Sequence, residues 1–196
     1  MLFRLGENAL KKMNEKMNTY ISILRGINVS GKNIIKMVAL KNLFEGLGFQ
    51  NVSTYIQSGN VVFSTAQTDV KKLEHLICSQ IEKEFGLAVP VIVLTKENLQ
   101  YAIDNNPFSK DKDEKFLHLT FLAEKPMVFE TESIVEKKEN NEEISFAENV
   151  VYLYCPNGYG NTKLTNTFLE RKLKVTATTR NWKTTTELLK IIEQIR

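Results

Sequence analysis

The chain has 196 residues, of which 42% are hydrophobic and 25% are charged, a composition typical of a globular protein of one large or two small domains. Its apolar runs are far too short to cross a bilayer, and residues 1–16 contain no continuous apolar segment of the kind found in a secretory leader. The net charge of +3 is too small to indicate nucleic-acid binding by itself.

Hydrophobic spacing in residues 17–95 alternates between the period of a strand and that of a helix. Gly48 and Gly86 can end helices, and Thr68 or Asp69 can cap the start of one. Ser58-Gly59 predicts a two-residue turn between two strands. The predicted order is strand 19–24, helix 37–47, strand 52–56, strand 61–64, helix 70–85 and strand 89–94.

This order is that of the ferredoxin-like unit, β-α-β-β-α-β. Right-handed crossovers then place the strands in the order 4-1-3-2. Pro90 is expected inside the fourth strand, and an edge position suits it because proline cannot donate to a sheet ladder.

The same order recurs after a connector helix over residues 96–104. Thr184 and Glu187 match a capping box and predict a closing helix. The predicted elements are strand 116–122, helix 129–138, strands 144–147 and 150–155, helix 163–173, strand 175–179 and a helix from residue 184. The expected fold is therefore α+β, with two ferredoxin-like halves, antiparallel sheets and a C-terminal helix. We divide the chain into an N-terminal extension (1–16), a first half (17–95), a connector (96–112) and a second half (113–196).

The loop after the first predicted strand reads RGINVSGKN, from Arg25 to Asn33. It fits the spacing of a nucleotide-hydrolase phosphate loop, but Asn33 stands where that loop needs Ser or Thr to hold magnesium. ATP or GTP hydrolysis is therefore not expected. Two interpretations stay open: the glycines and asparagines shape backbone turns, or Arg25, Lys32 and the loop amides cradle an anion.

A second polar motif, YIQSGN, joins the second and third predicted strands. In the ferredoxin-like unit this hairpin lies at the same end of the sheet as the loop after the first strand. Two polar motifs thus converge on one edge, which favours a ligand site there. Its predicted members are Arg25, Asn28, Lys32, Asn33, Gln57, Ser58 and Asn60.

A further polar cluster is predicted where strands 150–155 and 175–179 end. Its members are Tyr159, Lys163, Arg180, Asn181 and Trp182. Trp182 suits a core position between the last strand and helix better than a base-stacking platform. Whether the two clusters meet depends on how the halves pack.

Neither histidine indicates a catalytic site from sequence alone. His75 lies off the apolar stripe of its helix, and His118 lies on a strand with no visible carboxylate or cysteine partner. Cys78 and Cys155 likewise have no Cys or His at metal-ligand spacing. Reduced thiols, no metal, no cofactor and a cytoplasmic location are the expectation.

The segments RGINVSGKN, TYIQSGNVVF, GYGNTKL and TTRNW resemble, in this order, the bacterial domain-of-unknown-function family 1697. The resemblance runs from Met17 to the C-terminal helix and leaves residues 1–16 outside it. It implies two ferredoxin-like halves and supplies no activity, substrate or catalytic residue.

The sequence favours a protein that binds a small anionic, phosphate-bearing ligand at the edge formed by residues 25–33 and 57–60. The alternatives are an enzyme acting on such a ligand, a protein-interaction scaffold and a binder of the nucleic-acid backbone. RNA binding on the sheet face is disfavoured, because the third strand lacks the glycine–aromatic pattern of the RNA-recognition module. Oligomeric state does not follow from the sequence.

Overall fold

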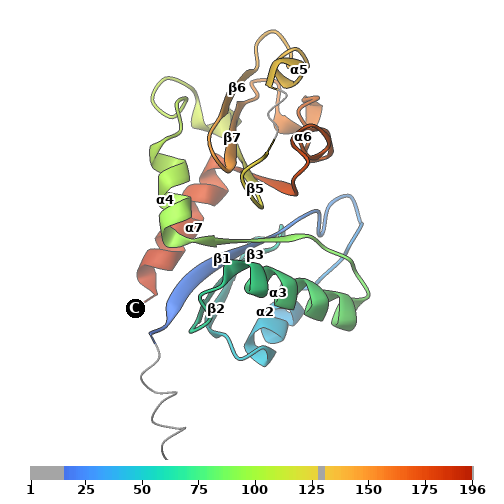
Figure 1. Ribbon diagram of the computed structural model, residues 1–196, viewed down its shortest axis with the longest axis vertical. Coiled ribbons are helices and arrows are strands. Elements are labelled where there is room, and N and C mark those ends of the chain that lie inside the picture. The colour runs from blue at the N-terminus through green and yellow to red at the C-terminus, as the bar shows by residue number, and fades with distance from the viewer. Residues whose placement is uncertain (1–15, 128–130, 196) are drawn as a thin grey trace, which may run out of the picture.

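The computed structural model describes residues 16–127 and 131–195 and contains two four-stranded antiparallel sheets (Figure 1). The first sheet has the order β2-β3-β1-β4, as predicted. Helices α2 and α3 pack on its outer face. The bounds are β1 (Asn18–Leu24), α2 (Met37–Gly46), β2 (Gln50–Tyr55), β3 (Asn60–Thr65), α3 (Val70–Phe85) and β4 (Val91–Thr95).

The second sheet has the order β6-β7-β5-β8, which repeats the topology of the first. Its outer helices are α5 and α6, and two short 3-10 turns, η1 and η2, flank its strands. The bounds are η1 (Glu114–Phe116), β5 (Leu117–Leu122), α5 (Thr131–Val135), β6 (Glu143–Phe146), β7 (Val150–Tyr154), η2 (Tyr159–Asn161), α6 (Asn166–Leu173) and β8 (Ala177–Asn181). The predicted α+β fold of two ferredoxin-like halves is confirmed.

Two helices, α4 (Lys96–Asp104) and α7 (Trp182–Gln194), join the halves. They supply apolar side chains to a core that also contains the inner faces of both sheets. Figure 1 shows both helices along one side of the molecule, next to the two sheets. Ile21 and Ile23 of β1 point into this shared core, whereas Tyr20 and Leu24 point into the core under α2 and α3. Because both faces of β1 are covered, apolar side chains point to both sides of it, and Ser22 is the polar residue between Ile21 and Ile23.

Several predicted boundaries are wrong, each for a local reason. β4 lies at a sheet edge but begins at Val91, so Pro90 precedes it. The β2–β3 connection spans residues 56–59 rather than a two-residue turn, and Tyr55 pairs with Asn60. α7 begins at Trp182 because Asn181, not Thr184, accepts the capping bond; its side chain accepts a hydrogen bond from the backbone N–H of Thr184.

The remaining helices of the second half are shorter than predicted. α6 begins at Asn166 because the Thr165 hydroxyl caps it. α5 covers Thr131–Val135 of the expected 129–138, where residues 129 and 130 lie outside the described part of the chain. Across the described residues, no helix is both long and apolar enough to span a bilayer.

Candidate functional site

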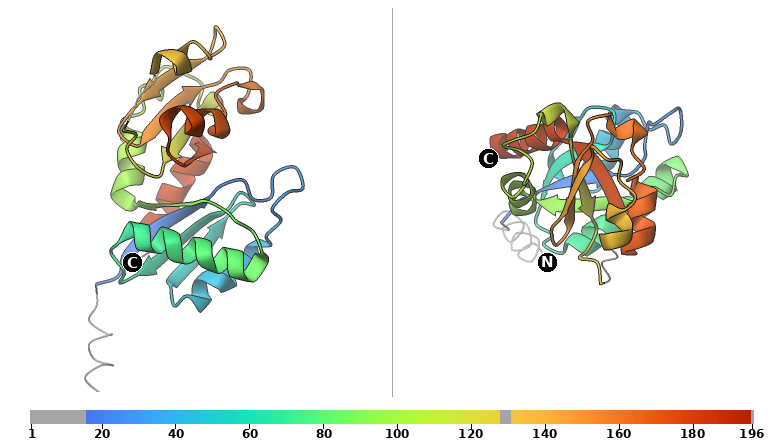
Figure 2. Two further views of the ribbon diagram at one scale, coloured as in Figure 1. Left: turned by 45° about the vertical axis from the view of Figure 1, so that its right-hand side comes forward. Right: turned by 90° about the horizontal axis from the view of Figure 1, so that it is seen from above.

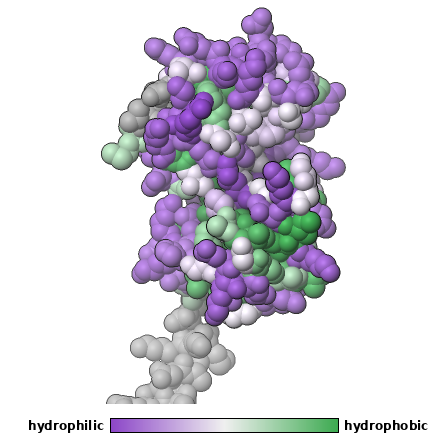
Figure 3. Space-filling view, turned by 90° about the vertical axis from the view of Figure 1, so that its right-hand side faces the viewer, coloured by the Kyte–Doolittle hydropathy of each residue, from purple (hydrophilic) through white to green (hydrophobic). Residues whose placement is uncertain are grey.

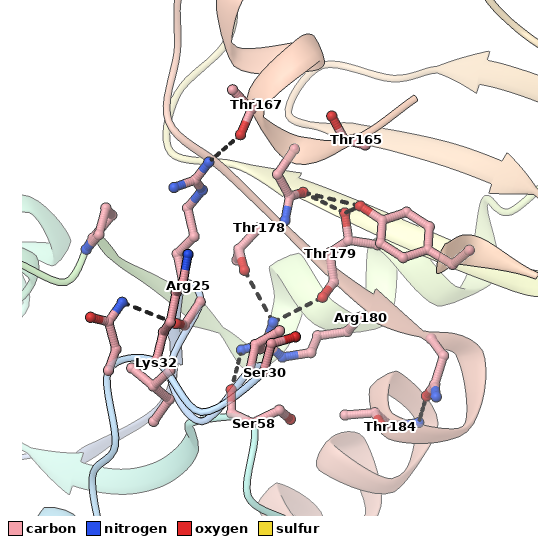
Figure 4. Close-up of a pocket in the computed structure, with 18 of the residues that line it drawn as sticks. Arg25, Ser30, Lys32, Ser58, Thr165, Thr167, Thr178, Thr179, Arg180 and Thr184 are labelled. Atoms are coloured by element: carbon pink, nitrogen blue, oxygen red, sulfur yellow. Dashed lines mark hydrogen bonds between the residues drawn. The ribbon is translucent and has the colours of Figure 1, made fainter. Parts of the chain in front are cut away.

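A cleft of about 1020 Å³ lies between the two halves (Figure 4). The first half contributes the loop after β1, the β2–β3 connection and the residues before β4. The second half contributes the start of β5, the loop after β7, the first turn of α6 and the end of β8. The two predicted clusters therefore meet across one cleft, although they lie more than a hundred residues apart in the sequence.

The loop after β1 is held in one shape by backbone conformation and by two asparagines. Five of its residues have positive φ, and Val29 and Lys32 form a small hairpin around Ser30 and Gly31. The Asn28 amide donates 2.9 Å hydrogen bonds to the Ile35 and Gln57 carbonyls. Figure 2 shows the blue loop projecting from the first half. Asn28 therefore acts on the loop itself, as the backbone-turn interpretation expects.

The β2–β3 connection lies against the end of β1. The Leu24 N–H donates to the Gly59 carbonyl at 2.8 Å. A Cβ added to Gly59 would lie 2.7 Å from the Leu24 Cβ and 2.8 Å from the Ile27 Cδ1. Asn60 is fully buried, and its amide donates to the Tyr55 carbonyl and the Ser58 hydroxyl. This connection has no room for a larger residue at position 59.

Arg180 of β8 reaches across the interface between the halves. Its Nε donates to the Asn60 Oδ1 at 2.5 Å. Its Nη2 donates to the carbonyls of Leu24 at 2.7 Å and Ser58 at 2.8 Å. The guanidinium thus binds the end of β1 and the β2–β3 connection at once, and only 8% of the residue is exposed.

Within its own half, the Arg180 Nη1 donates to the Thr178 hydroxyl at 3.0 Å and the Thr179 carbonyl at 2.8 Å. All five guanidinium donors are therefore used, and every acceptor is a neutral oxygen. Burial lowers the pKa of Arg180 to about 9, which leaves it charged at neutral pH. The wall of the cleft thus contains a buried positive charge that pairs with no carboxylate of residues 16–127 and 131–195.

Arg25 crosses in the opposite direction, from the first half to α6. Its Nη2 lies 2.6 Å from the Glu170 Oε2 and donates to the Thr167 hydroxyl at 3.2 Å. Its Nε is buried and finds no hydrogen-bond partner among the described residues. The other Glu170 oxygen accepts from the Ala177 N–H at 3.0 Å. Most of the Arg25 charge is therefore balanced by Glu170.

Lys32 is exposed at the mouth of the cleft, and no ion pair to it is found within residues 16–127 and 131–195. Across from it, Thr165, Asn166 and Thr167 form the first turn of α6, whose dipole favours negative charge. The wall of the second half is also rich in hydroxyl groups, including those of Thr178 and Thr179.

His118 lines the cleft in a fixed orientation, which the sequence did not reveal. Its Nδ1 lies 3.1 Å from the Phe116 carbonyl, which assigns the Nδ1 proton and leaves Nε2 as the free acceptor. Its ring stacks on Tyr159, with ring centres 4.9 Å apart. Burial lowers the pKa of His118. The histidine is therefore a neutral base at pH 7.

Tyr159 is held by a network of hydroxyl groups under the cleft. Its hydroxyl donates to the Thr179 hydroxyl at 3.0 Å, and Thr179 donates to the Asn166 side chain at 2.6 Å. Thr179 also bonds the Thr120 hydroxyl at 2.7 Å. Burial raises the pKa of the Tyr159 hydroxyl. This network fixes the ring against which His118 stacks.

The predicted site residues fall into two groups. The cleft is lined by Arg25, Lys32, Asn33, Ser58, Tyr159, Arg180 and Asn181. The others lie outside the lining. Asn28 and Asn60 make structural hydrogen bonds, and Gln57 contributes its carbonyl to one of them. Lys163 pairs with Glu139 at 2.6 Å, and Trp182 is buried in the shared core, as its sequence context favoured.

The described residues offer no cluster of three or more His, Cys, Asp or Glu side chains that could hold a metal ion. Cys78 and Cys155 are both free thiols. Burial raises the pKa of Cys155 to about 12, so this thiol is not a nucleophile at neutral pH.

The architecture defines an α+β protein whose two ferredoxin-like halves enclose a cationic, hydroxyl-lined cleft. The family described as "Protein of unknown function (DUF1697)" matches residues 17–152, and the chain belongs to this family. The match ends before the motifs GYGNTKL and TTRNW, and it excludes residues 1–16.

The fold is similar to that of the conserved bacterial protein SP0830 from Streptococcus pneumoniae. The TM-score is 0.68 at 22% sequence identity, over 90% of this chain and 99% of that one. At this identity the likeness concerns the fold alone. No curated protein matches the chain.

Proposed function

We propose that the cleft between the halves binds a small phosphate-bearing anion. The observation that supports this proposal is the charge of the lining. Among the residues that the structure describes, the cleft is lined by three cationic side chains, Arg25, Lys32 and Arg180, and by no Asp or Glu. Arg180 is charged and buried, and the described part of the chain gives it no counterion, an arrangement that costs free energy and that a bound anion would offset.

The cationic groups would act differently on the ligand. Lys32 has a mobile, exposed ammonium and would contact the phosphate directly. Arg180 has no donor left, so it would act through its charge alone. The first turn of α6 and the nearby hydroxyls would supply hydrogen bonds. Arg25, paired to Glu170, would orient the ligand more than attract it.

The test is calorimetric titration of the full chain with inorganic phosphate, AMP, ribose 5-phosphate and a short oligonucleotide, at low and high salt. We expect saturable binding of at least one small phosphate, weakened about tenfold or more by Lys32→Ala. Lys36→Ala is the matched control, because Lys36 is exposed just beyond the loop and outside the cleft lining. Equal binding by wild type and Lys32→Ala would contradict the proposed site. Binding confined to the oligonucleotide and lost at high salt would favour a nucleic-acid backbone binder instead.

An enzyme acting on the same anion is the second candidate, and His118 is the observation that favours it. The assigned proton on Nδ1 leaves Nε2 able to accept a proton from a water or hydroxyl in the cleft. If the protein is an enzyme, His118→Gln retains phosphate binding but loses turnover, as followed by phosphorus NMR on a bound organic phosphate. Turnover that survives in His118→Gln would remove the histidine from the chemistry.

A further inference from the structure

Ile56 is both strained and exposed at the mouth of the cleft. Its φ of +49° is unfavourable for any side chain branched at Cβ, and 49% of the residue is exposed to solvent. The fold explains the backbone conformation, because the Asn28 amide bonds the next carbonyl, that of Gln57, and Gly59 lies against Leu24. It does not explain the residue type, since glycine or asparagine suits this conformation better.

Val29 places a second aliphatic side chain on the same rim. It is 57% exposed, and it forms the small hairpin whose partner is Lys32, with the Lys32 N–H donating to the Val29 carbonyl at 3.0 Å. An apolar side chain therefore stands within one turn of the Lys32 ammonium, which no described residue pairs. Both Val29 and Ile56 line the cleft. We call these two residues the aliphatic rim.

The first half exposes further aliphatic side chains. Ile34 and Val38 are also largely exposed. Figure 3 shows hydrophobic surface gathered on the first half on this face, next to the polar second half. Exposed apolar surface marks interaction sites and ligand-binding grooves, and ligand pockets are lined largely by apolar side chains, so the rim favours a ligand with an apolar or planar part.

The size of the cleft also favours a ligand larger than inorganic phosphate. Its volume of about 1020 Å³ is at the upper end of the range of about 300–1,000 Å³ for small-molecule sites. Inorganic phosphate would fill a small part of it. The cleft also has walls of different chemistry, with aliphatic side chains from the first half and hydroxyl groups from the second.

We propose that the ligand is an organic phosphate monoester whose apolar or planar part lies on the aliphatic rim. This inference rests on the proposed function and adds the class of ligand. The phosphate would bind Lys32 and the first turn of α6, and the organic group would cover Val29 and Ile56. Either a nucleotide base or an alkyl chain could cover the aliphatic rim in this way, and the experiment distinguishes between them.

The test compares four ligands by calorimetry with the full chain: AMP, hexyl phosphate, ribose 5-phosphate and inorganic phosphate. We expect AMP, hexyl phosphate or both to bind at least tenfold more tightly than the two polar ligands. A preference for AMP would assign the rim to a planar base, and a preference for hexyl phosphate would assign it to an alkyl chain.

Two variants locate the effect on the aliphatic rim. Ile56→Asn and Val29→Ser should each weaken the preferred organic phosphate about fivefold and leave inorganic phosphate unchanged. Ile56→Asn should not lower the thermal midpoint, because asparagine tolerates positive φ. Val38→Ser is the control, since Val38 is 73% exposed but does not line the cleft.

Failure of this inference can be told apart from failure of the proposed function. If all four ligands bind equally through Lys32, or if both rim variants bind the organic phosphate like wild type, the aliphatic rim has no role and the anion site remains. If none of the four ligands binds, both proposals are overturned.

Discussion

The first half meets the cleft with the carboxyl end of its first strand, β1, whereas the second half meets it with the amino end of its first strand, β5. The corresponding ends can be matched by their hydrogen bonds. In the first half the Leu24 N–H donates to the Gly59 carbonyl and the Arg25 N–H to that of Pro90. In the second half, the Leu122 N–H donates to the Asn149 carbonyl, and the N–H of Ala123 to that of Thr176.

The residue of the second half that corresponds to Arg25 is therefore Ala123. Ala123 lies at the end of the second sheet that faces away from the cleft, whereas Arg25 lines the cleft. Its carbonyl accepts a hydrogen bond from Lys71 of α3 at 2.6 Å. The same element order thus has two structural roles: one end of the first unit lines the cleft, and the equivalent end of the second unit packs against α3 of the first half. Topology alone does not assign function to an edge, because the packing of the halves decides which edges face each other.

The largest expected effect on stability concerns the two arginines that cross the interface between the halves. Arg180→Met should lower the free energy of unfolding by about 3–5 kcal/mol, because it leaves buried Asn60, Leu24 and Ser58 oxygens without donors. Arg25→Met, which breaks a partly exposed ion pair, should cost only about 1 kcal/mol. Urea denaturation measures both values, and Lys183→Met, at an exposed position of α7, is the control. Equal losses for the two arginines would contradict the difference in burial on which this prediction rests.

The close contact at Gly59 is specific to the first half and gives a somewhat smaller effect. Gly59→Ala combines positive φ with a Cβ that would clash with Leu24 and Ile27, and we expect a loss of about 2–4 kcal/mol. Gly31→Ala is a matched control, since it has the same φ of +74° but nothing within 4 Å of its Cβ. The loss of stability in Gly59→Ala minus the loss in Gly31→Ala gives the steric contribution alone. A Gly31→Ala loss as large as that of Gly59→Ala would show that backbone strain accounts for both.

The smallest expected effect concerns His118 in the second half. Its pKa is lowered in the folded state by burial, so the unfolded chain binds a proton that the folded chain does not when the pH falls below about 6.5. Stability should therefore decrease as the pH falls from about 7 to about 5. His118→Gln should reduce this slope in urea denaturation, and His75→Gln is the control. An NMR titration that placed the His118 pKa above its ordinary value would contradict the prediction.

The sequence predicted helices and strands well where a capping residue or a regular spacing of apolar residues marked them. The Asp69 side chain, one of the two caps that the sequence offered, caps α3, and Gly86 ends it in the left-handed conformation, as predicted. Sequence alone could not choose between Asn181 and Thr184 as the cap of α7, because both residue types cap helices. The short, polar α5 likewise has too few apolar positions to show a period.

The candidate site was only partly predictable, because its decisive contacts join distant parts of the chain. The spacing of Arg25, Lys32 and Ser58 relative to the strands placed these residues at one end of the first sheet. Nothing in that spacing shows that Arg180 donates to Asn60, 120 residues away. His118 appeared isolated on its strand, because its stacking on Tyr159 depends on the path of the loop after β7.

The core between the two sheets has a consequence for how the chain unfolds. Residues 17–95 have the element order of a complete ferredoxin-like unit, yet among residues 16–127 and 131–195 one face of their sheet is covered by α4, α7 and the second half rather than by a helix of their own. A fragment cut after residue 95 would expose Ile21, Ile23 and Ile92 to water, so it lacks part of the burial that stabilises it in the full chain. The halves are consequently expected to unfold in one cooperative transition, and the geometry of the cleft persists for as long as the whole molecule stays folded.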